Sequence, residues 1–164
     1  MKKKVGVAVV CIVLVVIGSI LLKKDDRADP VSKSERKKYG ETIFNYMKAE
    51  TYFNSETVEA SPEVKKIKLT LDFYGQEVNE EKITVYLNQT VSGIDRAGQD
   101  VYGSNFPVVY TLEKQNNGYT VIQYEEPGNG SFYEEDIKRM FPAKMFSAVN
   151  KVKSGKITFE EDVE

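Results

Sequence analysis

The chain has 164 residues, a net charge of −2, a single cysteine and no histidine. Its length corresponds to one domain with a short additional segment, and the single cysteine excludes an internal disulfide. The missing imidazole excludes catalytic triads, most zinc sites and the commonest general base, which leaves carboxylates, tyrosines, lysines and hydroxyl groups for any chemistry.

The first predicted element is a membrane-spanning helix over residues 5–22. The segment VGVAVVCIVLVVIGSILL carries no charged side chain and lies between MKKK and Lys23. At about 1.5 Å of rise per residue it forms a helix of roughly 27 Å, close to the hydrocarbon thickness of a bilayer. We therefore expect residues 1–24 to be an uncleaved signal anchor in the lipid bilayer of the cell membrane. The chain would then be a single-pass protein with its C-terminal domain outside the cytoplasm.

Two alternatives to this anchor and its orientation stay open. A basic start followed by an apolar run is also typical of a cleaved signal peptide, which would release a secreted protein. The run continues past Val16-Ile17-Gly18-Ser19, where a peptidase would cut, and this favours the anchor. Lysine and arginine are more numerous after the run than before it, which favours the opposite orientation.

The remainder of the chain is acidic. The first 24 residues hold five of the 23 basic residues and none of the acidic ones, so residues 25–164 hold 18 basic against 25 acidic residues, a net charge of −7. Nucleic acid is not an expected partner, because phosphate binding requires a basic face. We expect a tether over 25–31, an α+β domain over 32–155, and an acidic C-terminal tail or short strand over 156–164.

The domain begins with a predicted helix. Ser32-Lys33-Ser34-Glu35 matches a capping box, and apolar residues then recur at helical spacing at Tyr39, Ile43, Tyr46 and Met47. Gly40 weakens the middle of this helix by about 1 kcal/mol relative to alanine. We expect the apolar stripe to pack on a sheet, with a membrane-surface helix as the alternative.

The next segments predict four or five antiparallel strands. TYFNSETVEAS (51–61) is a weak strand, and the segments KIKLTLDF (66–73) and KITVYLNQTV (82–91) alternate apolar and polar residues. The side chains expected to face inward are Ile67, Leu69, Leu71, Phe73, Ile83, Val85, Leu87 and Val91. Residues 74–81 predict a turn, 92–105 a loop, and 107–127 a hairpin closed by Asn116-Asn117-Gly118.

The C-terminal part predicts further helices. Pro127-Gly128-Asn129-Gly130 ends the hairpin, and Ser131-Phe132-Tyr133-Glu134 matches a second capping box. Ile137, Met140 and Phe141 are expected to face inward, Pro142 ends or kinks the helix, and a new apolar stripe follows over 143–152. The expected fold is therefore α+β, with a helix packed on a four- to five-stranded antiparallel sheet and helices at the C-terminus.

Residues 106–142 resemble a segment of membrane-anchored proteins from Gram-positive bacteria. The residues that carry the resemblance are PVVYTL (107–112), NGY (117–119), YEEPGNGSFY (124–133), DIK (136–138) and FP (141–142). Some of those proteins are similar to the extracellular tail of antibiotic-sensing, BlaR1-type membrane peptidases. The resemblance implies a small extracytoplasmic accessory or sensing module with a cystatin-like or NTF2-like fold. It does not extend to the peptidase, whose HExxH motif requires histidine.

The segment around the Pro-Gly elbow holds the candidate site residues. Its carboxylates, among them Glu134 and Glu135, would in principle supply the acid and base of a glycosidase, although acidic residues in the first turn of a helix are expected from the helix dipole alone. The candidate ligand or partner surface comprises Tyr124, Glu126, Phe132, Tyr133, Asp136 and Arg139. The alternative is that these residues seal a structural joint between hairpin and helix. We predict no catalytic, metal-binding or cofactor-binding residue.

These observations favour a non-enzymatic, membrane-anchored module that binds or senses a protein, a peptide or an envelope component. A carboxylate-dependent hydrolase of envelope glycans is the main alternative, and an anchor without any ligand is a third. In each case the bilayer is the first expected partner, through residues 5–22.

Overall fold

The computed structural model describes residues 29–49, 63–145 and 155–163. The predicted anchor over 5–22, the weak strand over 51–61 and the apolar stripe beyond Met145 lie outside these described residues. Among the described residues, no helix is both long enough and apolar enough to span a bilayer.

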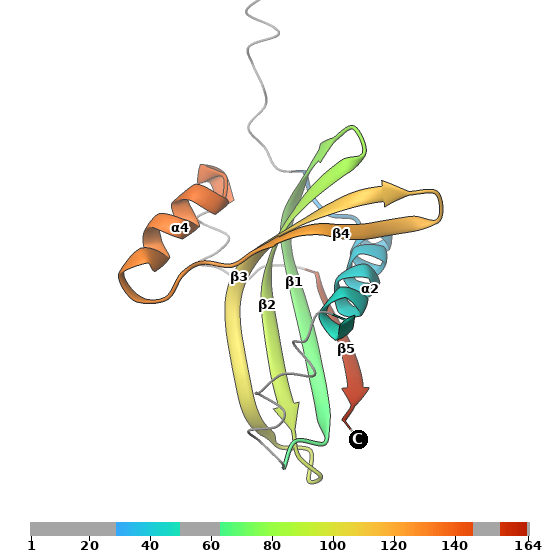
Figure 1. The fold of residues 1–164 in the computed structure, drawn as a ribbon, viewed down its shortest axis with the longest axis vertical. Helices are drawn as coiled ribbons and strands as arrows, with labels where there is room; N and C mark the ends of the chain where they lie inside the picture. The colour runs from blue at the N-terminus through green and yellow to red at the C-terminus, as the bar shows by residue number, and fades with distance from the viewer. Residues whose placement is uncertain (1–28, 50–62, 146–154, 164) are drawn as a thin grey trace, which may run out of the picture.

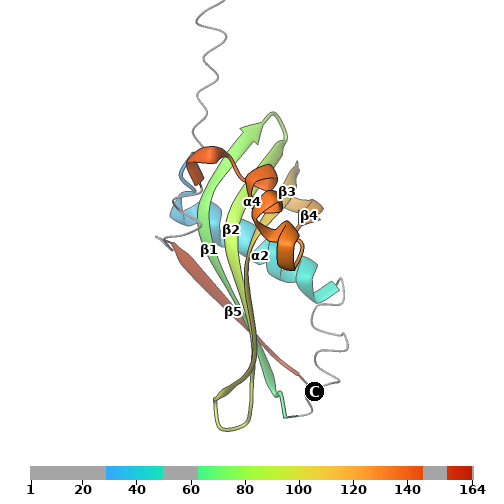
Figure 2. The same ribbon diagram turned by 90° about the vertical axis from the view of Figure 1, so that its left-hand side faces the viewer.

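The domain is a curled antiparallel sheet with helices on two faces. The sheet has five strands in the order β4-β3-β2-β1-β5. The elements are α2 (Lys33–Ala49), β1 (Lys66–Asn79), β2 (Lys82–Ile94), β3 (Asp100–Gln115), β4 (Gly118–Glu125), α4 (Tyr133–Met140) and β5 (Lys156–Asp162). Figure 1 shows α2 lying across one face, and the turned view in Figure 2 places α4 in front of the sheet and α2 behind it. The expected α+β architecture is confirmed.

Helix α2 begins with the predicted capping box. The Ser32 backbone N–H donates to Glu35 Oε2 over 2.8 Å, and the Glu35 N–H donates to Ser32 Oγ over 3.3 Å. These two bonds satisfy donors that a helix start otherwise leaves unpaired. The stripe of Tyr39, Ile43 and Met47 is buried against the sheet, so the sheet-packing interpretation is confirmed over a membrane-surface helix.

Gly40 has a different role from the one its helix propensity suggests. A Cβ atom at this position would lie 2.9 Å from the Phe159 ring and 3.1 Å from Ile157. The missing side chain therefore lets β5 approach the helix closely. Phe159 also stacks on Phe44 of α2, with ring centroids 5.0 Å apart.

The main core lies between α2 and the sheet. All eight side chains that the alternation of 66–73 and 82–91 predicts to face inward are in it: Ile67, Leu69, Leu71, Phe73, Ile83, Val85, Leu87 and Val91. Two buried glutamines interrupt this apolar interior. Tyr39 donates to Gln76 Oε1 over 3.0 Å, and Tyr110 donates to Gln89 Oε1 over 2.7 Å.

A second, smaller cluster lies on the other face of the sheet. Helix α4 and the residues after it pack Ile137, Met140 and Phe141 against Tyr86 and Val109. The inward orientation predicted for the three α4-side residues is confirmed. This cluster is separate from the main core, so α4 is attached to the sheet by its own small set of apolar contacts.

Two predicted connections are strands instead. Residues 74–79 continue β1 past a bulge between Phe73 and Gly75, and the turn is confined to the residues between Asn79 and Lys82. Most of the predicted loop over 92–105 is paired as the ends of β2 and β3, because Asp95 Oδ1 accepts from the N–H groups of Ala97 and Gln99 and closes a much shorter turn.

The start of α4 also differs from the prediction. A short 3-10 turn occupies Gly130–Phe132, α4 begins at Tyr133, and no side chain caps it, so the second capping box is wrong. The chain changes direction through a positive φ of 71° at Gly130, which glycine adopts readily. Residues 156–162 form β5 beside β1, which is the strand alternative for the C-terminal segment.

Candidate functional site

The Pro-Gly elbow between β4 and α4 is held by an ionic network. Arg139 contacts Glu125 through one guanidinium nitrogen and donates to Asp136 Oδ1 through the other over 3.0 Å. Asp136 Oδ2 in turn accepts the Gly128 backbone N–H over 2.8 Å. The contacts join the end of β4, the elbow and α4, so they have the geometry of a joint.

The electrostatics of this network oppose acid catalysis. The Gly128 N–H and Arg139 hold the pKa of Asp136 below its usual range. Lys138 donates to Glu134 Oε1 over 2.6 Å and lowers the pKa of Glu134. A glycosidase needs one carboxyl group whose pKa is raised, so that it can act as the acid. Neither of these two carboxylates meets that requirement.

The aromatic residues of the predicted surface do not gather into one site. Tyr124 packs against the main core, tilts against the Tyr110 ring at a centroid distance of 5.0 Å, and donates to Glu126. Phe132 and Tyr133 project to solvent with exposed fractions of 65% and 42%. Of the six candidates, the structure therefore brings Asp136 and Arg139 together, pairs Tyr124 with Glu126, and leaves the other two exposed.

A concave site lies at the other end of the hairpin. A groove of about 470 Å³ separates the exposed side of α2 from the β3–β4 turn. We call it the hairpin groove. It is lined by Lys38, Glu41, Thr42 and Asn45 from α2 and by residues 114–119 from the hairpin.

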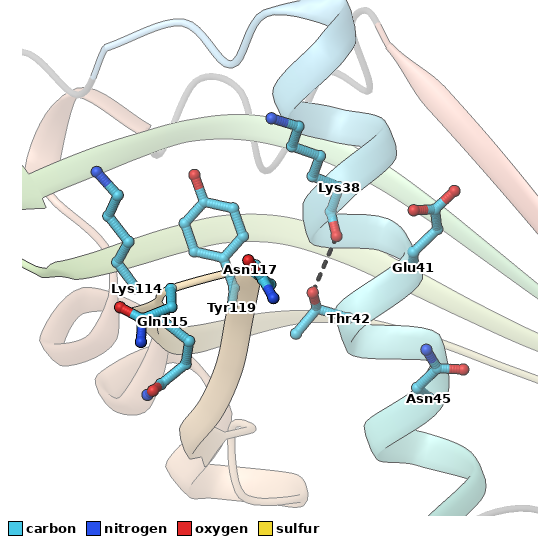
Figure 3. Close-up of a pocket in the computed structure, with 10 residues that line it drawn as sticks. Lys38, Glu41, Thr42, Asn45, Lys114, Gln115, Asn117 and Tyr119 are labelled. Atoms are coloured by element: carbon cyan, nitrogen blue, oxygen red, sulfur yellow. Dashed lines mark hydrogen bonds between the residues drawn. The ribbon is translucent and has the colours of Figure 1, made fainter.

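The lining of the hairpin groove is rich in amides and amino groups. Asn45, Gln115, Asn116 and Asn117 present side-chain amides, each able to donate and to accept hydrogen bonds. In the view of Figure 3, the amino groups of Lys38 and Lys114 and the Tyr119 hydroxyl point to the same side. Among the described lining residues Glu41 is the one carboxylate, and Lys37 lies 3.9 Å from it.

Two residues of the groove are held by the domain beneath it. The Tyr119 ring meets the buried Tyr39 ring edge-on at a centroid distance of 5.0 Å, which fixes the aromatic wall. Thr42 donates to the Lys38 carbonyl over 3.0 Å, so its hydroxyl is turned back onto the helix. The Gln115 amide donates to Glu113 Oε2 over 3.2 Å. Among the described lining residues, the lysines and the three asparagine amides are therefore the groups that remain for a ligand.

Sequence reasoning missed this groove. Its residues are exposed polar side chains of a helix and of a turn, and each segment by itself is an ordinary solvated surface. The turn at Asn116-Asn117-Gly118 and the apolar stripe of α2 were both predicted, but their juxtaposition depends on how the sheet curls. The run of three amides beside a lysine and a tyrosine, over 114–119, was the available signal.

No family model, curated protein or solved structure matches this chain.

Proposed function

We propose that the chain is a non-enzymatic, membrane-anchored module outside the cytoplasm whose hairpin groove binds an envelope component with many hydrogen-bonding groups and some negative charge. Soluble peptide or glycan fragments of the cell wall have this chemistry. The observation that carries the proposal is the concentration of four side-chain amides, two lysines and one fixed aromatic ring in a single groove.

The composition of the groove favours binding over hydrolysis. A carboxylate-dependent glycosidase needs two carboxylates at a set separation, and the described lining residues include only Glu41. Amides and an aromatic wall instead provide directional hydrogen bonds and contact area, which suit recognition of a polar ligand. The two lysines supply the attraction for a carboxylate or phosphate group.

The position of the domain and its finer fold class belong to the same proposal. The apolar segment 5–22 would tether the domain to the bilayer, and the resemblance of residues 106–142 to Gram-positive envelope proteins supports an extracytoplasmic location. A helix lying across a curled antiparallel sheet supports a cystatin-like or NTF2-like description. Protease treatment of intact cells tests the location, because an outward-facing domain is digested without lysis.

Calorimetry with soluble wall fragments tests the groove. The variant Asn45→Ala/Lys114→Gln should weaken binding by about ten-fold or more, because losing a charge-assisted hydrogen bond costs about 1.5 to 3 kcal/mol. The control Asn129→Ala/Lys138→Gln removes the same groups from the elbow and α4 and should bind normally. Equal loss in both variants, or cleavage of the fragments, would argue against a binding groove.

A further inference from the structure

A second concave surface lies at the N-terminal end of α2 and is basic. The hollow has a volume of about 720 Å³ and is lined by Lys33, Ser34, Arg36 and Lys37 of α2 and by Lys156 and Ile157 of β5. We call it the basic hollow. Four of these six side chains are cationic, and no carboxylate is among the described residues that line it.

The fold holds these charges together. Lys33, Arg36 and Lys37 share one side of α2 because they are three and four residues apart. Arg36 donates to the Val31 carbonyl over 2.7 Å and passes so close to Gly155 that a Cβ there would lie 2.7 Å from the guanidinium. This close approach brings the start of β5, and with it Lys156, beside the first turns of the helix.

The surroundings of the hollow make it the exception on an acidic domain. Residues 25–164 carry a net charge of −7. Elsewhere, Lys48 of α2 pairs with Glu161 at 2.6 Å, and Lys66 of β1 pairs with Glu160 at 3.1 Å. At the hollow, Lys37 lies 3.9 Å from Glu41, and the charge of Lys156 acts on Asp72. The four cations of the hollow outnumber these two carboxylates, and the resulting charge asymmetry would orient the domain near a negatively charged surface.

The position of the hollow along the chain identifies that surface. The predicted anchor ends at Leu22, and the fold is already fixed at Asp29, whose backbone pairs with Gln76 over 2.8 and 2.9 Å. The residues between them span roughly 20 Å even when fully extended. The first turns of α2 are therefore confined close to the bilayer, and electrostatic attraction to anionic lipid acts over about 8–10 Å at physiological salt.

We propose that the basic hollow docks the domain on anionic phospholipid headgroups of the membrane in which its own anchor is inserted. The contact deepens the proposed function, on whose membrane anchorage it rests. It would hold the domain in one orientation on the bilayer, as a second, electrostatic attachment beside the apolar helix. The hairpin groove is lined by α2 residues between 38 and 45, further along the helix than the basic hollow, and would stay accessible in this orientation.

The test measures how close the hollow lies to the bilayer in the full chain reconstituted in nanodiscs. Cys11→Ser removes the single native cysteine, and Ser34→Cys places a fluorophore at the hollow. Ala97→Cys labels the β2–β3 loop as a distant control (Figure 1). Lipids with a nitroxide headgroup quench the fluorophore. We expect quenching at position 34 to rise about two-fold or more when 30% of a neutral lipid is replaced by phosphatidylglycerol.

A matched pair of variants separates the hollow from overall charge. Lys33→Gln/Lys156→Gln should remove at least about half of that rise. Lys68→Gln/Arg96→Gln changes the net charge equally and should keep it, while 0.5 M salt should abolish it in every variant. Equal quenching in neutral and anionic nanodiscs, or equal losses in both variants, would overturn docking alone. A chain that does not co-elute with nanodiscs would overturn the anchorage and docking together.

Discussion

Asp72 is an acidic residue in a buried environment that does not suit a charged side chain. Its side chain lies on the α4 side of β1 with 2% of its surface exposed, and neither carboxylate oxygen has a hydrogen-bond partner. Burial raises the pKa of Asp72, and the charge of Lys156 lowers it by a smaller amount. Tyr74, two residues on, also has an unpartnered hydroxyl, and burial together with Asp72 raises the pKa of Tyr74 to about 12.

The variant Asp72→Asn should therefore stabilise the protein at pH 7.5 by about 1 kcal/mol, because it removes a buried unpaired charge. Since the pKa of Asp72 is raised on folding, the ionised carboxylate destabilises the native state above that pKa. This penalty decreases as the pH falls through the native-state pKa of Asp72. The free energies of unfolding of the two proteins should therefore converge in acid. Urea denaturation at pH 7.5 and pH 4 measures both differences.

The control for this prediction is Asp162→Asn. Asp162 is the last residue of β5, the strand that pairs with β1, and 87% of its side chain is exposed, so this change should alter stability by less than about 0.5 kcal/mol. A less stable Asp72→Asn protein, with a deficit that persists at pH 4, would mean that the carboxylate has a stabilising partner.

At the scale of elements, the contact between α2 and β5 depends on one missing side chain. Helix propensity alone predicts that Gly40→Ala stabilises α2 by about 1 kcal/mol. The contact with Phe159 and Ile157 reverses that sign, because the added Cβ would lie 2.9 Å from the Phe159 ring. We expect a net loss of about 1 to 3 kcal/mol, as for other overpacked cores.

Urea denaturation of Gly40→Ala measures whether the free energy of unfolding falls or rises. Gly103→Ala is a matched control. Gly103 lies in β3. A Cβ atom added there would lie 3.8 Å from the Val91 carbonyl oxygen, which is an ordinary van der Waals contact. This control should change stability little. A stabilised Gly40→Ala protein would show that β5 is not packed against α2 in the way described.

Helix α4 is attached to the sheet by a small apolar cluster of its own, so it should unfold from the sheet without disrupting the main core. Ile137→Ala removes one of the buried residues that pack on Tyr86 and Val109 and should cost about 2 to 5 kcal/mol locally. Hydrogen exchange followed by mass spectrometry should show faster exchange over residues 133–145, with α2 and β1–β3 unchanged. The control Ile122→Ala alters an exposed residue of β4 and should leave exchange unchanged. Uniformly faster exchange in Ile137→Ala would contradict two separate clusters.

The sequence predicted the elements best where local signals were unambiguous. The Ser32 capping box, the alternation from Ile67 to Phe73 and the turn at Asn116-Asn117-Gly118 each specify one local conformation. The prediction from sequence failed where strand pairing overrides the local residue composition. Val101 and Tyr102 of β3 are exposed and lie among glycine and polar residues, yet they are in a strand because β2 pairs with this segment.

The site was less predictable than the fold, for a reason that belongs to the whole molecule. Proline, glycine, aromatic and charged residues cluster in sequence over the elbow from Tyr124 to Arg139, and several of them form a joint in the structure. The hairpin groove unites Asn45 with Lys114 and Tyr119, which are distant along the chain. Such a site arises from the curl of the sheet over α2, which no local pattern encodes.

At the scale of the whole molecule, the domain carries two concave sites along one helix. The basic hollow lies at the N-terminal end of α2, and the hairpin groove lies along the middle of the same helix. In our proposal the hollow faces the bilayer and the groove faces the envelope. Helix α2 therefore contributes to both the proposed lipid contact and the proposed ligand site. In this arrangement the bilayer would fix the direction in which the groove opens.

Amide chemical-shift mapping tests whether the hairpin groove is the ligand-binding site. The full chain in nanodiscs would be titrated with soluble wall fragments, and the mass of the fragments would be followed in the same sample. We predict shifts concentrated at residues 38–45 and 114–119, with fragments of unchanged mass. Shifts concentrated at residues 124–139, or fragments that are cleaved during the titration, would contradict it.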